Sequence, residues 1–283
     1  MMTRRTFGGA EVTTELVEGQ PLRVARWHWE LLDADPAGNP PLVFFNGIGA
    51  DLKTFGPLAA ALDDRPVLSW DMPGIGRSPA PVAPYSAGDV AATAIALLDR
   101  FGCDVVDVMG LSWGGCMAQQ LALDFPERVR KLVLAATGPG LGVMPGAQWH
   151  LSPLHLVPSL ADAEFFAGYL PGPWQQMMAW PSPRIAAPRP PSVHGYSYQL
   201  LAVAGWQSAF ALAFLRKPTL VLMGDSDAVV PLLNGHLLKG LIADSRLEVI
   251  RGGGHMFLLS HAEESVTLLR DFLDRTTEPI AAG

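Results

Sequence analysis

The stretch from Val105 to Gln120 reads Val-Val-Asp-Val-Met-Gly-Leu-Ser-Trp-Gly-Gly-Cys-Met-Ala-Gln-Gln and decides the fold. Its apolar start, ending at Met109, predicts a buried strand, and the small and apolar residues from Gly114 to Phe125 predict a helix. The pattern Gly110-x-Ser112-x-Gly114 lies between the two. In this strand–turn–helix setting, the pattern predicts a sharp, strained turn that presents the Ser112 hydroxyl as a nucleophile.

The residues next to Ser112 fit such a turn. Glycine is needed on both sides, because a Cβ there would strike the neighbouring strand or helix. The turn leaves the Trp113 backbone N–H at the start of a helix, where it is aimed at developing negative charge. The G-x-S-x-G pattern also occurs in ordinary Gly/Ser loops, so the flanking strand and helix are what support the prediction.

Composition restricts the class of protein. With 283 residues, of which 49% are hydrophobic and 17% charged, we expect one large α/β domain or a domain with an insertion. The net charge of −7 argues against a nucleic-acid partner, which would require a basic face. No apolar run approaches the roughly 18 residues of a membrane span, so we expect no transmembrane segment.

Two further observations concern the compartment. Arg4 and Arg5 faintly resemble an export signal, but the apolar stretch that such a signal needs does not follow them. The two cysteines, Cys103 and Cys116, suit a reducing compartment and offer neither a disulfide framework nor zinc-ligand spacing. The sequence therefore predicts a cytoplasmic protein, without a metal site and with neither cysteine as the nucleophile.

Strands and helices alternate along most of the chain, which predicts a mostly parallel sheet. An antiparallel hairpin is expected first, within residues 12–32. The expected strands are 42–45, 67–70, 105–109, 129–135, 218–223 and 247–250, and the expected helices are 58–62, 87–101, 114–125, 232–241 and 262–273.

The alternation stops after Thr137, where Gly, Pro, Trp and Met become frequent. Large aromatic residues among the prolines indicate packing rather than a disordered linker. We therefore expect a cap, residues 138–215, inserted between the core segments 1–137 and 216–283, with a helical last part over residues 196–214. Trp149 and Trp180 in this cap are expected to contact the substrate.

The loop after the strand 42–45 reads Asn-Gly-Ile-Gly-Ala-Asp from Asn46 to Asp51. It is not a phosphate-binding loop, because Leu52 stands where glycine should precede Lys53, and it lacks the third glycine of a dinucleotide fingerprint. The remaining interpretation is the loop that donates the second oxyanion N–H, here from Ile48. Gly47 would let the backbone approach the substrate, and Asn46 and Gly47 are both expected to contact it.

A serine nucleophile needs a base, and the base needs an orienting carboxylate. Both Asp225 and Asp227 follow the strand 218–223. Asp225 is only two residues past the strand and more plausibly shapes the turn. Asp227 lies deeper in the loop and is favoured as the orienting residue.

Of the seven histidines, His255 alone follows a late strand on a glycine-rich loop that could reach a distant serine. His261 falls at the start of the next helix, and His236 lies inside one. The hypothesis is therefore a Ser112 nucleophile, a His255 base and an Asp227 that orients the imidazole. Met256, beside His255, is expected to contact the substrate, and the reaction needs no metal or organic cofactor.

Several segments resemble one enzyme family. The Ser112, Asp227 and His255 loops and Asp71-x-Pro73-Gly74-x-Gly76-x-Ser78 resemble the α/β-hydrolase superfamily. The segments 45–50 (Phe-Asn-Gly-Ile-Gly-Ala) and 110–115 (Gly-Leu-Ser-Trp-Gly-Gly) resemble the intracellular poly(3-hydroxyalkanoate) depolymerases of the medium-chain-length type, for which Asn46 is a sharper mark.

The resemblance implies the α/β-hydrolase fold, with helices on both faces of the sheet and an inserted cap. It also implies hydrolysis of a storage polyester at intracellular granules, which releases 3-hydroxyacids. Residues 138–193 match the family poorly, so the preferred side-chain length stays open. The alternatives are a small-molecule carboxylesterase or lipase, a carbon–carbon bond hydrolase and a non-catalytic granule-binding protein; the oligomeric state is not predicted.

Overall fold

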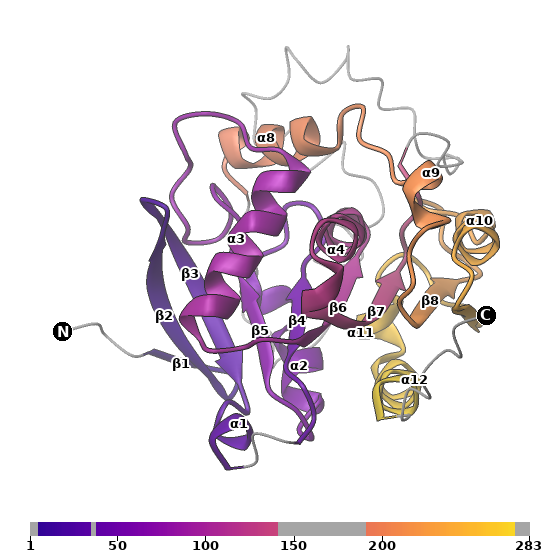
Figure 1. Cartoon of the computed structure of the whole chain (residues 1–283), viewed down its shortest axis with the longest axis horizontal. Helices are drawn as coiled ribbons and strands as arrows, with labels where there is room; N and C mark the ends of the chain where they lie inside the picture. The colour runs from indigo at the N-terminus through magenta and orange to yellow at the C-terminus, as the bar shows by residue number, and fades with distance from the viewer. Residues whose placement is uncertain (1–4, 35–37, 141–190, 275–283) are drawn as a thin grey trace.

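The computed structural model of the protein describes residues 5–34, 38–140 and 191–274 (Figure 1). Within these residues the strands form a single nine-stranded sheet in the order β1-β2-β3-β5-β4-β6-β7-β8-β9. The strands are β1 (Arg5–Phe7), β2 (Ala10–Val17), β3 (Gln20–Trp27), β4 (Leu42–Phe45), β5 (Val67–Trp70), β6 (Val106–Leu111), β7 (Val129–Ala135), β8 (Thr219–Gly224) and β9 (Ser245–Ile250).

The sheet is parallel from β5 to β9 and antiparallel at its N-terminal edge. β2 and β3 form the expected hairpin, whose turn places Glu18 and Gly19 at φ angles of 48° and 83°. Positive φ at both central positions is the geometry of a type I′ hairpin turn, and glycine adopts it without strain. The predicted mostly parallel sheet with an opening hairpin is therefore confirmed.

Helices cover both faces of the sheet (Figure 1). α3, α4, α9 and α10 pack on one face, and α2, α11 and α12 pack on the other. The bounds are α1 (Glu30–Ala34), α2 (Leu52–Ala61), α3 (Ala87–Arg100), α4 (Trp113–Asp124), the 3-10 helix η1 (Pro126–Arg128), α8 (Val193–Val203), α9 (Ala209–Leu212), α10 (Leu233–Leu241), α11 (Phe257–Ser260) and α12 (Ala262–Asp274).

β4 shows why the core strands are apolar at every position. Successive side chains of a strand point to opposite faces, and both faces of this sheet are covered. Leu42 and Phe44 pack into the cluster under α2 and α12, while Val43 and Phe45 pack into the cluster under α3 and α4. Phe45 meets Trp70 edge-on, with the ring centroids 5.1 Å apart.

Two expectations about helices need correction. The helix expected at 58–62 begins earlier, at Leu52, because the Asp51 side chain accepts the Lys53 N–H and caps its first turn. The helical segment expected over 196–214 is two helices, α8 and α9, separated by residues 204–208. The described residues therefore place the end of the expected cap on two short helices rather than on one.

Charged side chains gather where the parallel strands begin. Asp107 on β6 is fully buried and accepts hydrogen bonds from Arg130 at 2.8 and 2.5 Å. The buried Arg65 guanidinium lies 3.7 Å from the same carboxylate. Burial raises the pKa of Asp107, whereas the Arg130 hydrogen bonds lower it. This cluster ties β6 and β7 together at the edge opposite the loops that follow the strands.

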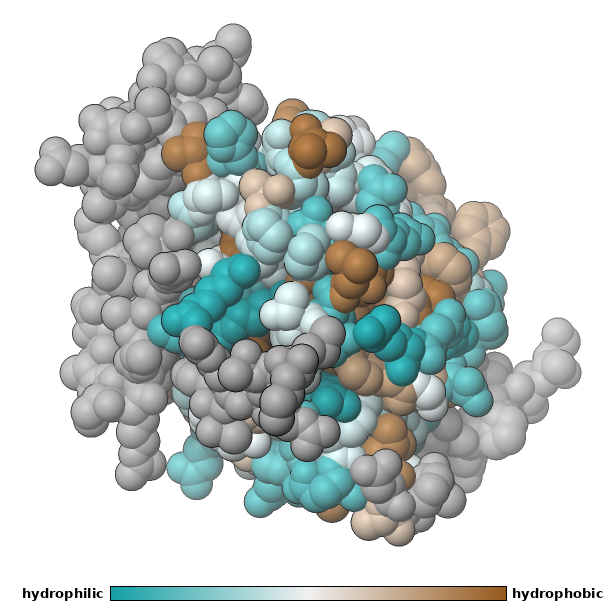
Figure 2. Space-filling view, turned by 90° about the vertical axis from the view of Figure 1, so that its left-hand side faces the viewer, coloured by the Kyte–Doolittle hydropathy of each residue, from teal (hydrophilic) through white to brown (hydrophobic). Residues whose placement is uncertain are grey.

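Surface properties agree with a globular chain. None of the helices in the described ranges has the length and apolarity needed to cross a bilayer. Figure 2 views the side at the left of Figure 1, where apolar side chains of the described residues are separated by hydrophilic ones. Scattered apolar residues of this kind are ordinary for a protein surface and indicate no binding site.

Candidate active site

Ser112 occupies the turn between β6 and α4, as predicted. Its φ and ψ angles are 54° and −119°, a conformation that is strained for a residue with a side chain. Two backbone contacts hold it: the Ser112 N–H donates to the Ala135 carbonyl at 2.8 Å, and the Thr137 hydroxyl donates to the Ser112 carbonyl at 2.8 Å. The end of β7 and Thr137, which follows it, thus hold the turn at the Ser112 N–H and at the Ser112 carbonyl.

The glycines of the motif are required by close packing. A Cβ on Gly110 would lie 2.1 Å from the Gly114 carbonyl oxygen, and a Cβ on Gly114 would lie 2.2 Å from the Phe45 carbonyl oxygen. Both distances are far shorter than van der Waals contact. The turn can therefore form against β4 only with glycine at these positions, which agrees with the sequence interpretation.

The loop after β4 lies beside Ser112. A Cβ built on Gly47 would be 3.9 Å from the Ser112 Cβ, so the loop backbone and the serine side chain are neighbours. Ile48 follows in a turn closed by the hydrogen bond from Ala50 N–H to the Gly47 carbonyl, at 3.1 Å. Trp113 is the first residue of α4, where a backbone N–H has no carbonyl of a preceding turn to bond. The expected donors, Ile48 and Trp113, thus belong to segments on either side of Ser112.

Asn46 is buried beneath this loop. Its Nδ2 donates to the Ser69 hydroxyl at 3.3 Å, and that hydroxyl donates its one proton to the Phe44 carbonyl at 2.8 Å. Because Ser69 can then only accept from Asn46, the orientation of the amide is fixed. Within the described residues the Asn46 Oδ1 has no hydrogen-bond partner, so its expected contact with substrate stays a proposal.

Asp71 supports the same loop from the end of β5. Its carboxylate accepts the Leu52 N–H at 2.8 Å and the Arg77 N–H at 3.0 Å, and Arg23 lies 3.3 Å away. Burial raises the pKa of Asp71, while the two backbone hydrogen bonds and Arg23 lower it. This carboxylate links the first residue of α2 to the loop after β5, so its role in the described residues is structural.

Asp227 and His255 meet directly. The Asp227 Oδ2 lies 2.8 Å from the His255 Nδ1, and the Asp227 Oδ1 accepts the N–H groups of Val229 and Val230 at 2.8 and 2.9 Å. The Asp227 carboxylate is fully buried, and 8% of the His255 side chain is exposed. Since a carboxylate only accepts, Nδ1 carries a proton, and a neutral imidazole then has Nε2 free to accept one.

The structure gives Asp225 a different role from Asp227. Asp225 is exposed, and its Oδ1 accepts the Gly252 N–H at 2.7 Å. The expectation that Asp225 shapes the turn agrees with these contacts. Ser112, Asp227 and His255 all follow the carboxyl ends of parallel strands, but the Ser112 hydroxyl has no hydrogen bond within the described residues. The transfer of its proton to His255 therefore belongs to the proposal below.

Gln199 is a site residue that the sequence analysis missed. It lies on α8 and is fully buried. Its Oε1 accepts the Gly49 N–H at 2.7 Å, and its backbone carbonyl accepts the Trp113 indole N–H at 2.7 Å. No local motif marks this glutamine, because its partners are separated from it by 150 and 86 residues.

Other expected contacts have different outcomes. Trp149 and Trp180 fall outside the described residues, as do residues 141–190 of the expected cap. Met256 directly precedes α11 and packs against the core cluster under α2 and α12.

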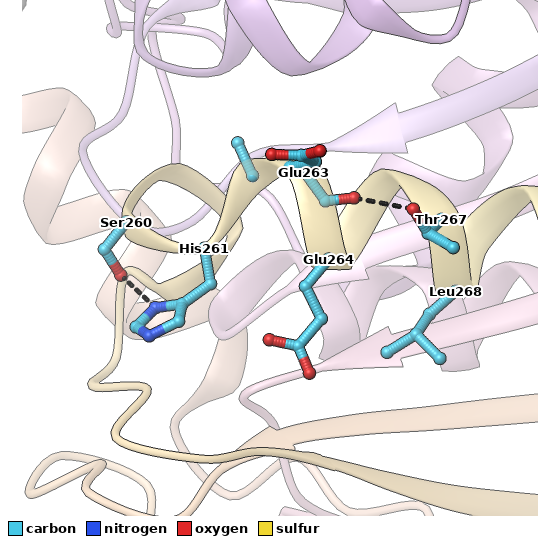
Figure 3. A pocket seen from close by; sticks show the side chains of 7 residues that line it. Ser260, His261, Glu263, Glu264, Thr267 and Leu268 are labelled. Carbon is cyan, nitrogen blue, oxygen red and sulfur yellow. Dashed lines mark hydrogen bonds between the residues drawn. The ribbon is translucent and has the colours of Figure 1, made fainter.

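His261 precedes α12, as expected, and its Nδ1 is hydrogen-bonded to the Ser260 hydroxyl at 2.8 Å beside a surface pocket (Figure 3). This pocket is lined by residues 260–264, 267 and 268, so it contains none of the proposed catalytic residues.

The cysteines fit the expected structural role. Burial raises the pKa of the Cys116 thiol to about 12 and that of the Cys103 thiol to about 11. A thiol that resists deprotonation is a poor nucleophile and a poor metal ligand. No group of three or more His, Cys, Asp or Glu side chains able to hold a metal ion occurs in the part of the chain that the structure describes.

Comparison with known proteins identifies the family. Residues 42–268 match the model of the alpha/beta hydrolase family. The chain belongs to this family. It is 37% identical over 246 residues to a poly(3-hydroxyalkanoate) depolymerase of Ectopseudomonas oleovorans, covering 83% of this chain and 84% of that protein. This agreement confirms the α/β-hydrolase fold and the resemblance that the sequence motifs indicated.

Two more similarities bear on the chemistry. The chain is 30% identical to 3-oxoadipate enol-lactonase 2 of Acinetobacter baylyi, covering 76% of this chain and 81% of that protein. Among solved structures, a hydrolase from Pseudomonas aeruginosa PA01 superposes with a TM-score of 0.76 at 26% identity, covering 93% of this chain and 98% of the other. The depolymerase and the enol-lactonase are named for different substrates, and the third protein is described only as a hydrolase.

Proposed function

We propose that the protein is a serine hydrolase that cleaves the ester bonds of poly(3-hydroxyalkanoate) and releases 3-hydroxyalkanoic acids. The observation that carries the chemistry is the 2.8 Å contact between the His255 Nδ1 and the Asp227 Oδ2. This contact fixes the tautomer in which Nε2 can accept a proton. It lies in the same set of loops as a serine held in a strained turn.

In the first half of the reaction, the Ser112 oxygen attacks the ester carbonyl carbon and its proton passes to the His255 Nε2. The oxyanion that forms is stabilised by the N–H groups of Ile48 and Trp113, each contributing about 3 kcal/mol. The intermediate collapses and the bond to the alcohol oxygen breaks. His255 gives its proton to this departing oxygen, which becomes a hydroxyl group. Asp227 stabilises the imidazolium while it carries the proton.

In the second half, water attacks the acyl group on Ser112 and gives its proton to His255. Collapse of this second oxyanion intermediate breaks the bond to Ser112, and His255 returns a proton to the serine oxygen. The products are a carboxylic acid and the regenerated enzyme. Protein groups supply every proton transfer, so the scheme requires no metal or organic cofactor.

The choice of a polyester substrate is supported by the depolymerase relative, which is 37% identical over 83% of the chain. The sequence of residues 45–50, which resembles the same family of depolymerases, agrees with this choice. A second candidate, a small ester, is favoured by the enol-lactonase relative, because a lactone is a cyclic ester. Both candidates use the same catalytic residues and differ in the size of the substrate, a polymer chain or a small ester.

The test is the release of acid from amorphous medium-chain-length polyhydroxyalkanoate granules, beside a short p-nitrophenyl ester, with Ser112→Ala as control. We expect release from granules that is lost in Ser112→Ala while the variant keeps its fold by circular dichroism. Turnover of the small ester alone would make the protein an esterase. Near-normal activity of Ser112→Ala on both substrates would overturn the catalytic scheme itself.

Association with the granule surface is part of the same proposal. Co-sedimentation of Ser112→Ala with granules measures binding without turnover. We expect the inactive variant to sediment with polyhydroxyalkanoate granules and to remain in the supernatant with hydrophilic beads. An inactive variant that stays in solution with both would restrict the substrate to soluble oligomers or small esters.

A further inference from the structure

Gln199 contacts both segments that flank the nucleophile. Its Oε1 accepts the N–H of Gly49, one residue after Ile48, and its backbone carbonyl accepts the indole N–H of Trp113. The side chain is fully buried. One residue of α8 is therefore hydrogen-bonded to the loop after β4 and to the first residue of α4 at the same time.

The orientation of this amide follows from its partner. A backbone N–H can only donate, so the atom that faces Gly49 is the oxygen of the amide. The Nε2 then has no hydrogen-bond partner within the described residues. By contrast, the Gln119 amide is fully used: its Nε2 donates to the Gly115 and Gly138 carbonyls, and its Oε1 accepts from Ser208. Gln199 is thus buried at a position where, among the described residues, only the oxygen of its amide is hydrogen-bonded.

α8 itself is held firmly against the core. The Ser192 hydroxyl donates to the Gly74 carbonyl at 2.7 Å, and the Ser192 N–H points to the same oxygen at 3.4 Å. A Cβ on Gly195 would lie 2.2 Å from the Gly74 carbonyl oxygen, so the helix and the loop touch at backbone distance. The position of Gln199 is therefore set by the packing of α8 on the loop after β5.

We propose that Gln199 is a positioning residue for the oxyanion hole, which fixes Ile48 through Gly49 and fixes Trp113 through its indole. This inference rests on the proposed function, since it assumes that these two backbone N–H groups stabilise the oxyanion. Such donors act only when they are placed in advance, and small displacements cost much of their effect. Gln199 acts on the transition state through these donors and does not touch the reacting atoms.

Two variants test the proposal, each by removing one of the two hydrogen bonds of Gln199, and a third serves as control. Gln199→Met keeps the length of the side chain and removes the acceptor for the Gly49 N–H. Trp113→Phe removes the indole donor to the Gln199 carbonyl and leaves the Trp113 backbone N–H in the chain. Gln120→Met, on α4, is the matched control, because it removes a glutamine Oε1 that accepts one N–H, the indole N–H of Trp206, away from the oxyanion donors.

The experiment measures kcat and KM on a p-nitrophenyl ester and the inhibition constant of an alkyl trifluoromethyl ketone, which forms an oxyanion adduct with the active serine. For Gln199→Met we expect kcat to fall about tenfold or more with KM changed by less than about threefold. The inhibition constant of the ketone should rise by about the same factor as kcat falls. Active sites are counted by fluorophosphonate labelling, so a partly unfolded sample does not imitate the effect.

Trp113→Phe should change kcat and ketone affinity in the same direction, and it carries the test if Gln199→Met does not fold. Gln120→Met should stay within about twofold of the wild type in both quantities. Ketone affinity within about twofold of the wild type in folded Gln199→Met would overturn the inference alone. A wild-type enzyme that is neither labelled nor inhibited would instead overturn the proposed function, and the inference with it.

Discussion

The Asp225 Oδ1 accepts a hydrogen bond from the Gly252 N–H at 2.7 Å, which joins the loop carrying Asp227 to the loop carrying His255. Two backbone hydrogen bonds run beside it, from Asp225 N–H to the Ile250 carbonyl at 3.2 Å and from Ser226 N–H to the Gly253 carbonyl at 3.0 Å. The short contact between Asp227 and His255 is thus supported by a second set of bonds between the same loops.

Replacement of Asp225 tests this support. Asp225→Ala removes the acceptor for Gly252, and we expect kcat/KM for a p-nitrophenyl ester to fall about tenfold because the His255 loop is less well placed. Asp225→Asn keeps an oxygen acceptor and should remain near the wild type. If both variants lose activity equally, the negative charge rather than the hydrogen bond is what Asp225 contributes.

Asp227→Asn should be far more damaging. The amide oxygen can still accept from Val229 and Val230, but its NH₂ then faces the His255 Nδ1 and favours the wrong tautomer. We expect kcat to fall by about 10⁴, as when the orienting carboxylate of a serine protease is replaced by an amide. Thermal unfolding should change little. Activity within about tenfold of the wild type would remove Asp227 from the proposed role.

The core of the fold was predictable because it depends on local patterns. Val67–Trp70 and Val129–Ala135 are strands with the bounds expected from their apolar runs, since both faces of the sheet are covered. The turn at Ser112 was predictable for a similar reason, because only glycine fits against the Phe45 and Gly114 carbonyls. The choice of Asp227 over Asp225 followed from its position deeper in the loop, and the contact with His255 agrees with it.

What could not be predicted depends on contacts between distant segments. Nothing near Gln199 in the sequence indicates that it bonds Gly49, 150 residues away. The start of α2, which was placed too late, is an exception, because both features that set it, the Asp51 cap and Pro57 inside the helix, are local. Asp71 was read only as part of a loop motif, whereas its bonds to Leu52 and Arg77 require the folded sheet.

Gly114→Ala should destabilise the protein severely. The added methyl group would lie 2.2 Å from the Phe45 carbonyl oxygen and 2.5 Å from that of Asn46, so β4 and α4 would have to separate. We expect a loss of about 2 kcal/mol or more in the free energy of unfolding, measured with urea. Gly240→Ala, in α10 with nothing near the added methyl group, should instead be neutral or stabilising by up to about 1 kcal/mol. Equal losses in the two variants would contradict this explanation of the motif.

Asp107→Ala tests the buried charges at the opposite edge of the sheet. The variant removes the two Asp107 oxygens that accept from Arg130, which keeps, among the described residues, only the Leu273 carbonyl. It also removes the carboxylate 3.7 Å from the buried Arg65 guanidinium, which keeps Asp64 and Asp274 as partners. Breaking a buried pair from one side costs about 3–5 kcal/mol when the remaining charge has no other partner. Because Arg65 and Arg130 keep other partners, we expect a loss of about 2–3 kcal/mol. Asp99→Ala, which removes an exposed partner of Arg128, should cost less than about 1 kcal/mol. Urea unfolding of the two variants compares them directly, and similar midpoints would show that Asp107 contributes no more than a surface charge.

The thiols provide a test of which side chain is the nucleophile. Burial raises the pKa of Cys116 to about 12 and of Cys103 to about 11. Because a raised pKa disfavours the thiolate, only about 10⁻⁴ of Cys116 and about 10⁻³ of Cys103 are deprotonated near pH 8. Iodoacetamide should therefore leave the native enzyme unmodified and active near pH 8, and it should alkylate both cysteines in urea. A fluorophosphonate should abolish activity under the same native conditions, with the label on Ser112. Loss of activity in step with alkylation of Cys116 would assign the nucleophile to that thiol instead.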